Sequence, residues 1–280
     1  MSGLVTSAVL LAAFMHAVWN AFLKADSDKL LSITSIVCAT GILAFFLIPF
    51  VGLPAVESWP YLGLSILAHS TYYVFLSQAY RYGEFAQVYP IARGSAPLLI
   101  VLWSVLVLRE SLSLLQLGTI AGIIFGIMVF ASRGFGTLTH NKKLTGFILL
   151  TSISIACYTL FDGQGARLSF NVPAYMVWLS VLDAIPLLLF TLTRRTVKQV
   201  VQNTLHWRAF FAAIVSLTAY WIVVWAMTQA PIALVAALRE TSIIIATLIG
   251  TFYFKEKSGY RRFVAAFVIC MSILILKLND

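Results

Sequence analysis

The sequence predicts an all-α integral membrane protein with ten transmembrane helices, arranged as two inverted five-helix repeats. Three observations lead to this fold class. The 280-residue chain is 61% hydrophobic and only 10% charged, with a mean hydropathy of +0.94, whereas about 25% of the residues in a soluble domain are charged. Its apolar residues gather into runs long enough to cross a bilayer. The later part of the first half of the chain is also repeated in the second half.

The apolar runs follow one another with short connections and leave no room for a soluble domain. They cover residues 4–24, 30–50, 59–80, 85–108, 114–132, 144–166, 172–193, 207–229, 231–254 and 259–277. The runs are about twice the length of a barrel strand and do not alternate, which excludes a transmembrane barrel. The first run has no basic segment before it and no clear cleavage site, so it is read as a retained helix.

The basic residues are distributed unevenly between the two sides of these runs. Of the 19 Lys and Arg residues, fourteen lie in connections that follow odd-numbered runs, and Arg109, Arg167 and Lys277 lie on the other side. The positive-inside rule then places the fourteen in the cytoplasm and both termini outside, in a multi-pass protein of the cell (inner) membrane. Orientation therefore explains the net charge of +9, and the lipid bilayer, not nucleic acid, is the expected partner.

An internal repeat relates the two halves. RGSAPLLIVLWSVLVLRE at 93–110 and RETSIIIATLIGTFYFKE at 239–256 both begin with Arg, end with a basic residue and Glu, and are apolar between. We expect repeats over 1–136 and 144–280, joined by a basic cytoplasmic linker at 137–143. Because five helices are an odd number, the second repeat enters the membrane from the opposite face, an arrangement that many secondary transporters use.

Arg93 and Arg239 are the first candidate site residues, because each lies inside an apolar run. Each is eight residues from the start of its run, on opposite faces, so each lies about 12 Å deep in a core of about 30 Å. The two therefore meet near the midplane, where inverted-repeat transporters bind substrate. Each buried Arg costs roughly 2.5–3.5 kcal/mol, which water, a counter-charge or an anionic ligand must offset. A structural ion pair and snorkelling to the interface are the alternatives.

Two acidic residues and a proline-rich segment complete the polar part of the runs. Glu240 is expected to meet Arg93 on another helix, because sequence neighbours on a helix do not face each other. Glu240 and Asp183 are proton-coupling candidates; a counter-ion or an interhelical hydrogen-bond partner is the alternative for Asp183. Pro90, Gly94 and Pro97 predict a hinge beside the pathway, because each Pro frees a carbonyl.

Polar and aromatic side chains provide further substrate-binding candidates. His16, Trp19 and Asn20 share one face of the first helix, although packing and an interfacial position explain them as well. The remaining candidates are His69, Tyr73, Tyr89, Tyr158 and Trp225. No metal or cofactor site is expected, because the three cysteines lie apart in apolar runs and no Walker A motif is present. A stripe of Gly118, Gly122 and Gly126 predicts close helix packing, within the chain or at a dimer face.

The chain resembles the drug/metabolite transporter superfamily, in its ten-helix EamA-type members. QAYRYGEFAQVYPIARGSAPLLIVLWSVLVLRESLSLLQLGTIAGIIFGIMVF at 78–130 and WAMTQAPIALVAALRETSIIIATLIGTFYFKEKSGYRRFVAAFVI at 225–269 both look like that family's half-repeat. The resemblance implies alternating access, with helices 1, 3, 4, 6, 8 and 9 around a central cavity. It also implies amino acids, other metabolites, nucleotide-sugars or phosphorylated sugars as cargo. The first-helix Glu of small multidrug exporters is absent, and His16 occupies that region.

Together these observations predict a secondary transporter for a small organic metabolite that bears an anionic group: an amino acid, a carboxylate or an organophosphorus compound. A proton is a candidate coupling partner. A flippase for lipid headgroups or lipid-linked phosphate is the alternative, and a non-transport enzyme or receptor is a minor one. No GxSxG, HExxH or paired-aspartate motif is present, so we expect no enzymatic activity. Both a monomer and a homodimer stay open.

Overall fold

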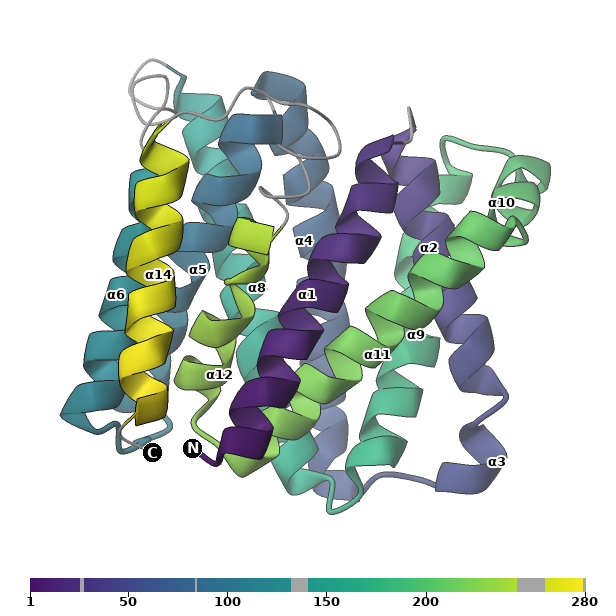
Figure 1. The fold of residues 1–280 in the computed structure, drawn as a ribbon. Helices are drawn as coiled ribbons and strands as arrows, with labels where there is room; N and C mark the ends of the chain where they lie inside the picture. The colour runs from purple at the N-terminus through teal and green to yellow at the C-terminus, as the bar shows by residue number, and fades with distance from the viewer. Residues whose placement is uncertain (26–27, 84, 132–140, 246–259, 279–280) are drawn as a thin grey trace.

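The computed structural model describes residues 1–25, 28–83, 85–131, 141–245 and 260–278, and every regular element in these ranges is helical (Figure 1). The long helices of the first half are α1 (Gly3–Ala25), α2 (Lys29–Phe45), α4 (Trp59–Tyr82), α5 (Phe85–Leu106) and α6 (Leu114–Ala131). The second half has α8 (Lys142–Leu168), α9 (Val172–Leu192), α11 (Trp207–Gln229), α12 (Ile232–Arg239) and α14 (Tyr260–Leu278). Short helices lie between them: α3 (Ile48–Val51), the 3-10 turn η1 (Val56–Ser58) and α10 (Val197–Thr204).

Four of the described helices are long and apolar enough to cross a membrane, judged by length and composition. They are α8, α9, α11 and the segment Gly3–Asn20 of α1. Shorter apolar helices cover Lys29–Phe45, Ile91–Leu106, Leu114–Val129 and Val264–Leu276. The 24-residue α4 is long but not among them. Its sequence includes HSTYY at 69–73, which lowers its hydropathy, and His69, Tyr72 and Tyr73 of this stretch line an internal cavity.

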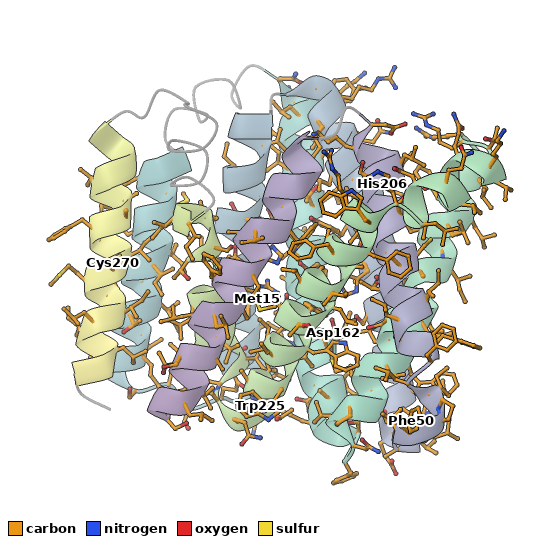
Figure 2. All side chains as sticks on the ribbon, turned by 45° about the vertical axis from the view of Figure 1, so that its right-hand side comes forward. Met15, Phe50, Asp162, His206, Trp225 and Cys270 are labelled. Carbon is orange, nitrogen blue, oxygen red and sulfur yellow. The ribbon has the colours of Figure 1, made fainter. Side chains whose placement is uncertain are left out.

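The outer surface of the helix bundle is strongly apolar. Leu4, Phe46, Phe50 and Leu114 are among many large hydrophobic side chains that are mostly exposed; Phe50 is 83% exposed. Figure 2 shows Phe50 at the edge of the bundle and Asp162 among the helices. A contiguous apolar surface of this extent marks contact with lipid, so the polarity of this protein is inverted relative to a soluble bundle.

The helices of the two halves pack on one another in matched pairs. Each of α1 and α8 packs on the third helix of the other half, so that α1 lies on α11 and α8 on α4. Likewise α5 contacts α8 and α12 contacts α1, while α2 pairs with α9 and α6 with α14. If α1, α2, α4, α5 and α6 are exchanged for α8, α9, α11, α12 and α14, the α1–α11 pair becomes α8–α4 and the α5–α8 pair becomes α12–α1. The α2–α9 and α6–α14 pairs become themselves. α1 begins and α14 ends at the same end of the bundle, here called the terminus end (Figure 1).

Glycines set the closest helix contacts at the α5–α6 and α6–α14 interfaces. A Cβ on Gly94 would lie 2.5 Å from Ile127 Cγ2, and one on Gly126 would lie 2.5 Å from Ile269 Cγ1. At Gly118 no atom lies within 4 Å of that position. Two of the three glycines of the stripe, Gly122 and Gly126, therefore serve packing of α6 against α14 within one chain.

Three element boundaries differ from the predicted runs. The second run ends early, at Phe45, and α3 follows with Pro49 in its first turn. α10 was not expected, although Thr196 and Gln199 form a capping box that the TVKQ sequence encodes. The predicted single helix over 231–254 is interrupted: α12 ends at Arg239, a turn covers residues 240–241, and 246–254 lie outside the described residues.

α5 stays helical through its prolines, whereas α12 ends at Arg239. α5 runs as one helix from Phe85 to Leu106 through Pro90, Gly94 and Pro97. Gly94 and Pro97 are buried there, and the side chain of Pro90 lies outside the described residues. The hinge assigned to these three residues stays a prediction. The predicted linker at 137–143 lies mostly outside the description, which resumes at Asn141.

Candidate functional site

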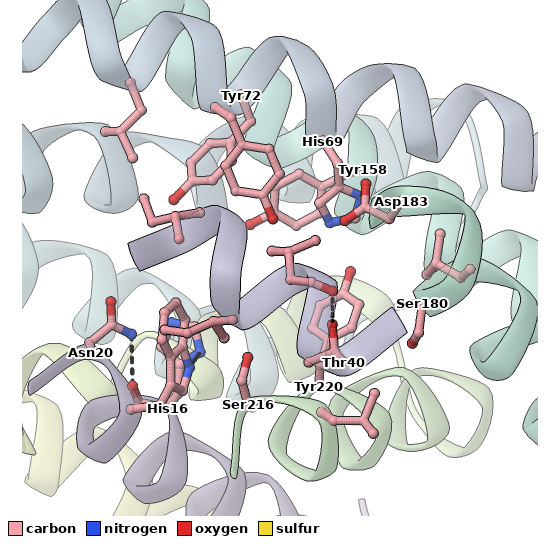
Figure 3. Close-up of a pocket in the computed structure, with 18 of the residues that line it drawn as sticks. His16, Asn20, Thr40, His69, Tyr72, Tyr158, Ser180, Asp183, Ser216 and Tyr220 are labelled. Carbon is pink, nitrogen blue, oxygen red and sulfur yellow. Dashed lines mark hydrogen bonds and ion pairs between the residues drawn. The ribbon is translucent and has the colours of Figure 1, made fainter. Parts of the chain in front are cut away.

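A cavity of about 160 Å³ lies between the two halves. Its walls come from α1, α2, α4, α5, α8, α9, α11 and α12, so α2 and α9 line it in addition to the six helices that the resemblance implied. Polar and aromatic residues dominate the lining (Figure 3): His16, Trp19, Asn20, Lys29, Thr40, His69, Tyr72, Tyr73, Tyr80, Arg93, Tyr158, Ser180, Asp183, Ser216, Tyr220 and Arg239. The volume suits a small solute with its water.

One carboxylate joins the two buried arginines. Arg93 Nε donates to Glu240 Oε2 and Arg93 Nη2 donates to Glu240 Oε1, each at 2.8 Å. Arg239 donates to Glu240 Oε1 from Nε and from Nη2, each at 3.3 Å. The three side chains are 5% (Arg93), 3% (Arg239) and 1% (Glu240) exposed. Among the described residues, the two guanidinium groups therefore share the one carboxylate of Glu240 beside the cavity.

The end of α12 explains how Glu240 reaches its own neighbour. Glu240 caps α12 and begins the turn at residues 240–241. The rule that adjacent side chains diverge applies within a continuous helix, and the helix ends between Arg239 and Glu240. Glu240 therefore contacts Arg93, as expected, and also Arg239, which was not expected.

His16 extends this cluster into the cavity. Trp19 Nε1 donates to His16 Nδ1 at 3.2 Å, and Arg93 Nη1 lies 3.1 Å from His16 Nε2. A neutral imidazole accepts at one nitrogen only. If Nδ1 accepts from Trp19, the proton is on Nε2, so two donors face each other across 3.1 Å. We call His16, Arg93 and Arg239 the donor end of the cavity, because an acceptor oxygen placed there would bind both facing donors.

A carboxylate lies in a separate part of the lining. Asp183 of α9 is near His69 of α4, whose Nδ1 is 3.9 Å from Asp183 Oδ1. The His69 ring stacks on Tyr158 with 4.1 Å between centroids and meets Tyr220 edge-on at 6.0 Å. Figure 3 shows His16 and Asn20 on one side of the cavity and Asp183 and Ser180 on the other. We call this second part the carboxylate end.

Asp162 is a buried acidic residue that the sequence analysis missed. It has no exposed surface, and it accepts hydrogen bonds from Tyr175, at 3.2 Å, and from Tyr220. Gly165 makes room for the Tyr175 ring, because a Cβ there would lie 2.5 Å from the Tyr175 hydroxyl. The rule that flagged Asp183, an acidic residue inside an apolar run, would have flagged Asp162 as well.

Contacts at the terminus end join the segment after α5 to the end of α8 and the start of α12. Glu110 Oε1 accepts from Arg167 Nη2 at 2.8 Å and from the Ile232 N–H at 3.0 Å. Arg167 also donates to the carbonyls of Met227 and Ala230, each at 2.9 Å. In the sequence, Glu110 was noted only as the last residue of the repeated segment 93–110. At the opposite end of the bundle, the cavity lining reaches Lys29 and Tyr80.

The other predicted site residues lie in different places. Trp225 is not part of the cavity lining; it packs against the apolar cluster that contains Ala226 and Val223. The side chain of Tyr89 lies outside the described residues. Thr40 and Ser216 line the cavity without having been predicted, because a hydroxyl in an apolar run carries little signal. Among the described residues, no group of three or more His, Cys, Asp or Glu side chains could hold a metal ion.

The all-helical bundle has an apolar outer surface and a central cavity with polar side chains in its lining. The profile of the EamA-like transporter family matches residues 4–132 and 144–278. The chain belongs to this family, within the drug/metabolite transporter superfamily, and the family implies a membrane transporter of small molecules. A solved crystal structure superposes with a TM-score of 0.72 over 99% of this chain and 96% of its own, at 17% identity; this likeness concerns the fold alone. No curated protein matches the chain.

Proposed function

We propose that the protein is a ten-helix secondary transporter that carries a small organic metabolite with an anionic group by alternating access. The observation that carries this proposal is the pair of buried guanidinium groups, Arg93 and Arg239, which come from the two halves of the chain, line the cavity and share the carboxylate of Glu240. An anion entering the cavity would be attracted by both guanidinium groups.

The matched helix pairs support two inverted repeats over 1–136 and 144–280. The pairing of α1 with α11 and of α4 with α8 is what a two-fold axis in the membrane plane would produce. In this arrangement the Glu110–Arg167 contacts hold the terminus end closed, while the cavity reaches the opposite end. The positive-inside rule makes that opposite end cytoplasmic and both termini extracytoplasmic.

The two acidic coupling candidates differ in their surroundings. Glu240 is held by Arg93 and Arg239, whereas Asp183 Oδ1 has no hydrogen-bond partner among the described residues. Asp183 is therefore the carboxylate better placed to exchange a partner during transport.

The test uses Arg93→Lys and Arg239→Lys, because each keeps a positive charge facing Glu240 and so preserves the fold. A set of small carboxylates and phosphate esters is first screened for thermal stabilisation of the purified protein. The anion that stabilises it most is then followed into proteoliposomes. We expect each variant to melt close to the wild type and to lose most anion-dependent transport. Normal transport by both variants would remove the two arginines from the site.

The lipid flippase stays the alternative, and the same proteoliposomes distinguish the two functions. Movement of a fluorescent anionic lipid between leaflets, without uptake of any soluble anion, would favour the flippase.

A further inference from the structure

We infer that the surface of α10 and of the turns on either side of it is a binding site for an anionic phospholipid. α10 joins α9 to α11 and lies at the end of the bundle opposite the terminus end (Figure 1). The site concerns residues 193–208, here called the α10 segment. The inference goes beyond the proposed transport, because it depends neither on the cavity nor on the solute.

The first observation is an exposed apolar stripe on a helix that is too short to cross a membrane. Val197, Val201 and Leu205 are 64%, 47% and 63% exposed, and their spacing places them on one side of the helix. Val200 and Thr204 are buried, and α10 packs against α2. Eight residues span about 12 Å, less than half of the hydrocarbon core of a bilayer. The stripe can therefore lie along a membrane surface but cannot cross it.

The second observation is that the charged side chains near the stripe are basic. The α10 segment contains Arg194, Arg195, Lys198 and Arg208 and no Asp or Glu. Arg195 Nε donates to Asp28 Oδ2 at 2.7 Å. Arg194, Lys198 and Arg208 are exposed, and in the described part of the chain these three form no ion pair with an acidic side chain. The segment therefore presents positive charge beside an apolar surface.

Aromatic rings hold two of the arginines at the border of this surface. The Arg194 guanidinium lies over the Phe190 ring, 4.8 Å from its centroid, and the Arg208 guanidinium lies 5.7 Å from the centroid of Trp207. Trp207 is 63% exposed. An exposed Trp beside Arg is typical of the headgroup level of a membrane, where the ring lies at the apolar boundary and the guanidinium reaches the phosphates.

An anionic phospholipid matches both parts of the surface. Its phosphate attracts the guanidinium and ammonium groups, and its acyl chains cover the apolar stripe. A zwitterionic lipid would cover the stripe but would bring its own cation to the basic side chains. A free phosphate would contact the basic side chains but leave the stripe uncovered. Each Lys or Arg near an anionic lipid surface contributes about fivefold in affinity.

The experiment measures Kd from the ligand dependence of the melting temperature of the purified full chain in detergent. The probes are dioctanoyl phosphatidylglycerol, dioctanoyl phosphatidylcholine and chain-free glycerophosphoglycerol, and we expect the first to bind most tightly. Arg194→Gln combined with Lys198→Gln should weaken phosphatidylglycerol binding by about 25-fold and phosphatidylcholine binding much less. Lys142→Gln combined with Lys143→Gln is the matched control, because it removes two exposed charges at the same end of the bundle. It should keep the wild-type Kd values.

A second variant tests the apolar stripe. Val201→Ser combined with Leu205→Ser keeps every charge and should weaken binding of both lipids by about 10-fold or more, because less apolar surface is covered. Both positions are exposed, so the fold should be retained. Binding of glycerophosphoglycerol, which has no acyl chains, should not change.

Three results would overturn the lipid site. If the two charge-removing variants weaken phosphatidylglycerol binding equally, net charge alone explains it. If glycerophosphoglycerol binds as tightly as the lipid, the segment is a site for a free phosphate. If the lipids show no preference and the chain is a dimer that Val201→Ser with Leu205→Ser separates, the stripe is an interface between two copies. None of these results bears on the proposed transport, because none of the changed residues lines the cavity.

Discussion

Replacing Glu240 by Gln tests whether one carboxylate neutralises both buried arginines. Gln keeps the shape of Glu but removes the charge that Arg93 and Arg239 share at 2.8 Å and 3.3 Å. All three side chains are at most 5% exposed, so water cannot replace the lost partner. Breaking a buried ion pair costs about 3–5 kcal/mol because it leaves an uncompensated charge. For a domain of 150–250 residues, that loss lowers the melting temperature by about 6–20 °C.

The assay is thermal unfolding of the purified protein in detergent, with two further variants. Glu240→Gln combined with Arg93→Gln removes one of the two orphaned cations, so we expect it to melt above Glu240→Gln alone. Asp28→Asn removes the partner of Arg195 in a pair whose side chains are 32% and 35% exposed, where the expected cost is below about 1 kcal/mol. Glu240 does not neutralise both arginines if Glu240→Gln melts as close to the wild type as Asp28→Asn does. The same conclusion follows if the added Arg93→Gln lowers the melting temperature further.

Three other results are expected. Gly94→Ala should lower the unfolding free energy by about 1–3 kcal/mol, because its Cβ would lie 2.5 Å from Ile127 Cγ2; Gly118→Ala, with open space around it, is the matched control and should not destabilise. For Asp28, burial raises the pKa, but hydrogen bonds from Arg195 and from the Leu31 N–H outweigh it and hold the pKa below its ordinary value of 3.8. Its stabilising effect is therefore complete above about pH 3.8 and is lost as the pH falls through the folded-state pKa, so melting curves of wild type and Asp28→Asn should converge near the acid limit. Finally, Glu110→Gln should weaken closure at the terminus end. With Glu110 intact, a membrane-impermeant maleimide should label the Ser180→Cys variant from the cytoplasmic side only. When Glu110→Gln is added to Ser180→Cys, the maleimide should label it from both sides. Unchanged one-sided labelling would show that the Glu110–Arg167 contacts do not hold that end closed.

The two buried arginines and their shared carboxylate could be found from the sequence because a charge in lipid is costly in free energy. Arg93, Arg239 and Glu240 stand out against long apolar runs, and the repeat placed the two arginines at similar depth from opposite faces. The same rule was applied to Asp183 but not to Asp162, which is the more buried of the two acidic residues. Trp225 was proposed because it is aromatic, and this property does not distinguish a cavity wall from an apolar interface.

Other features depend on contacts between segments distant in sequence. Glu110, after α5, meets Arg167 at the end of α8 and the Ile232 N–H at the start of α12, and no local pattern joins these residues. The interruption of α12 also had no local signal, because RETS at 239–242 contains neither Pro nor Gly. The groups that face the two cavity histidines also come from other parts of the fold: both ring nitrogens of His16 face donors, Trp19 Nε1 and Arg93 Nη1, whereas His69 Nδ1 faces the Ser65 carbonyl.

The sequence by itself determined that the chain is a helical membrane protein with an internal repeat. Hydropathy and charge are local properties, and they decide for each apolar run separately whether it can lie in the bilayer. It also determined which charges are costly enough to belong to a site. Only the tertiary structure decided which of them meet: that Glu240 binds two arginines instead of one, that α2 and α9 line the cavity, and that Asp183 is left without a donor. Which charged side chains contact one another depends on where the helices end and how they cross, and both are set by helix packing.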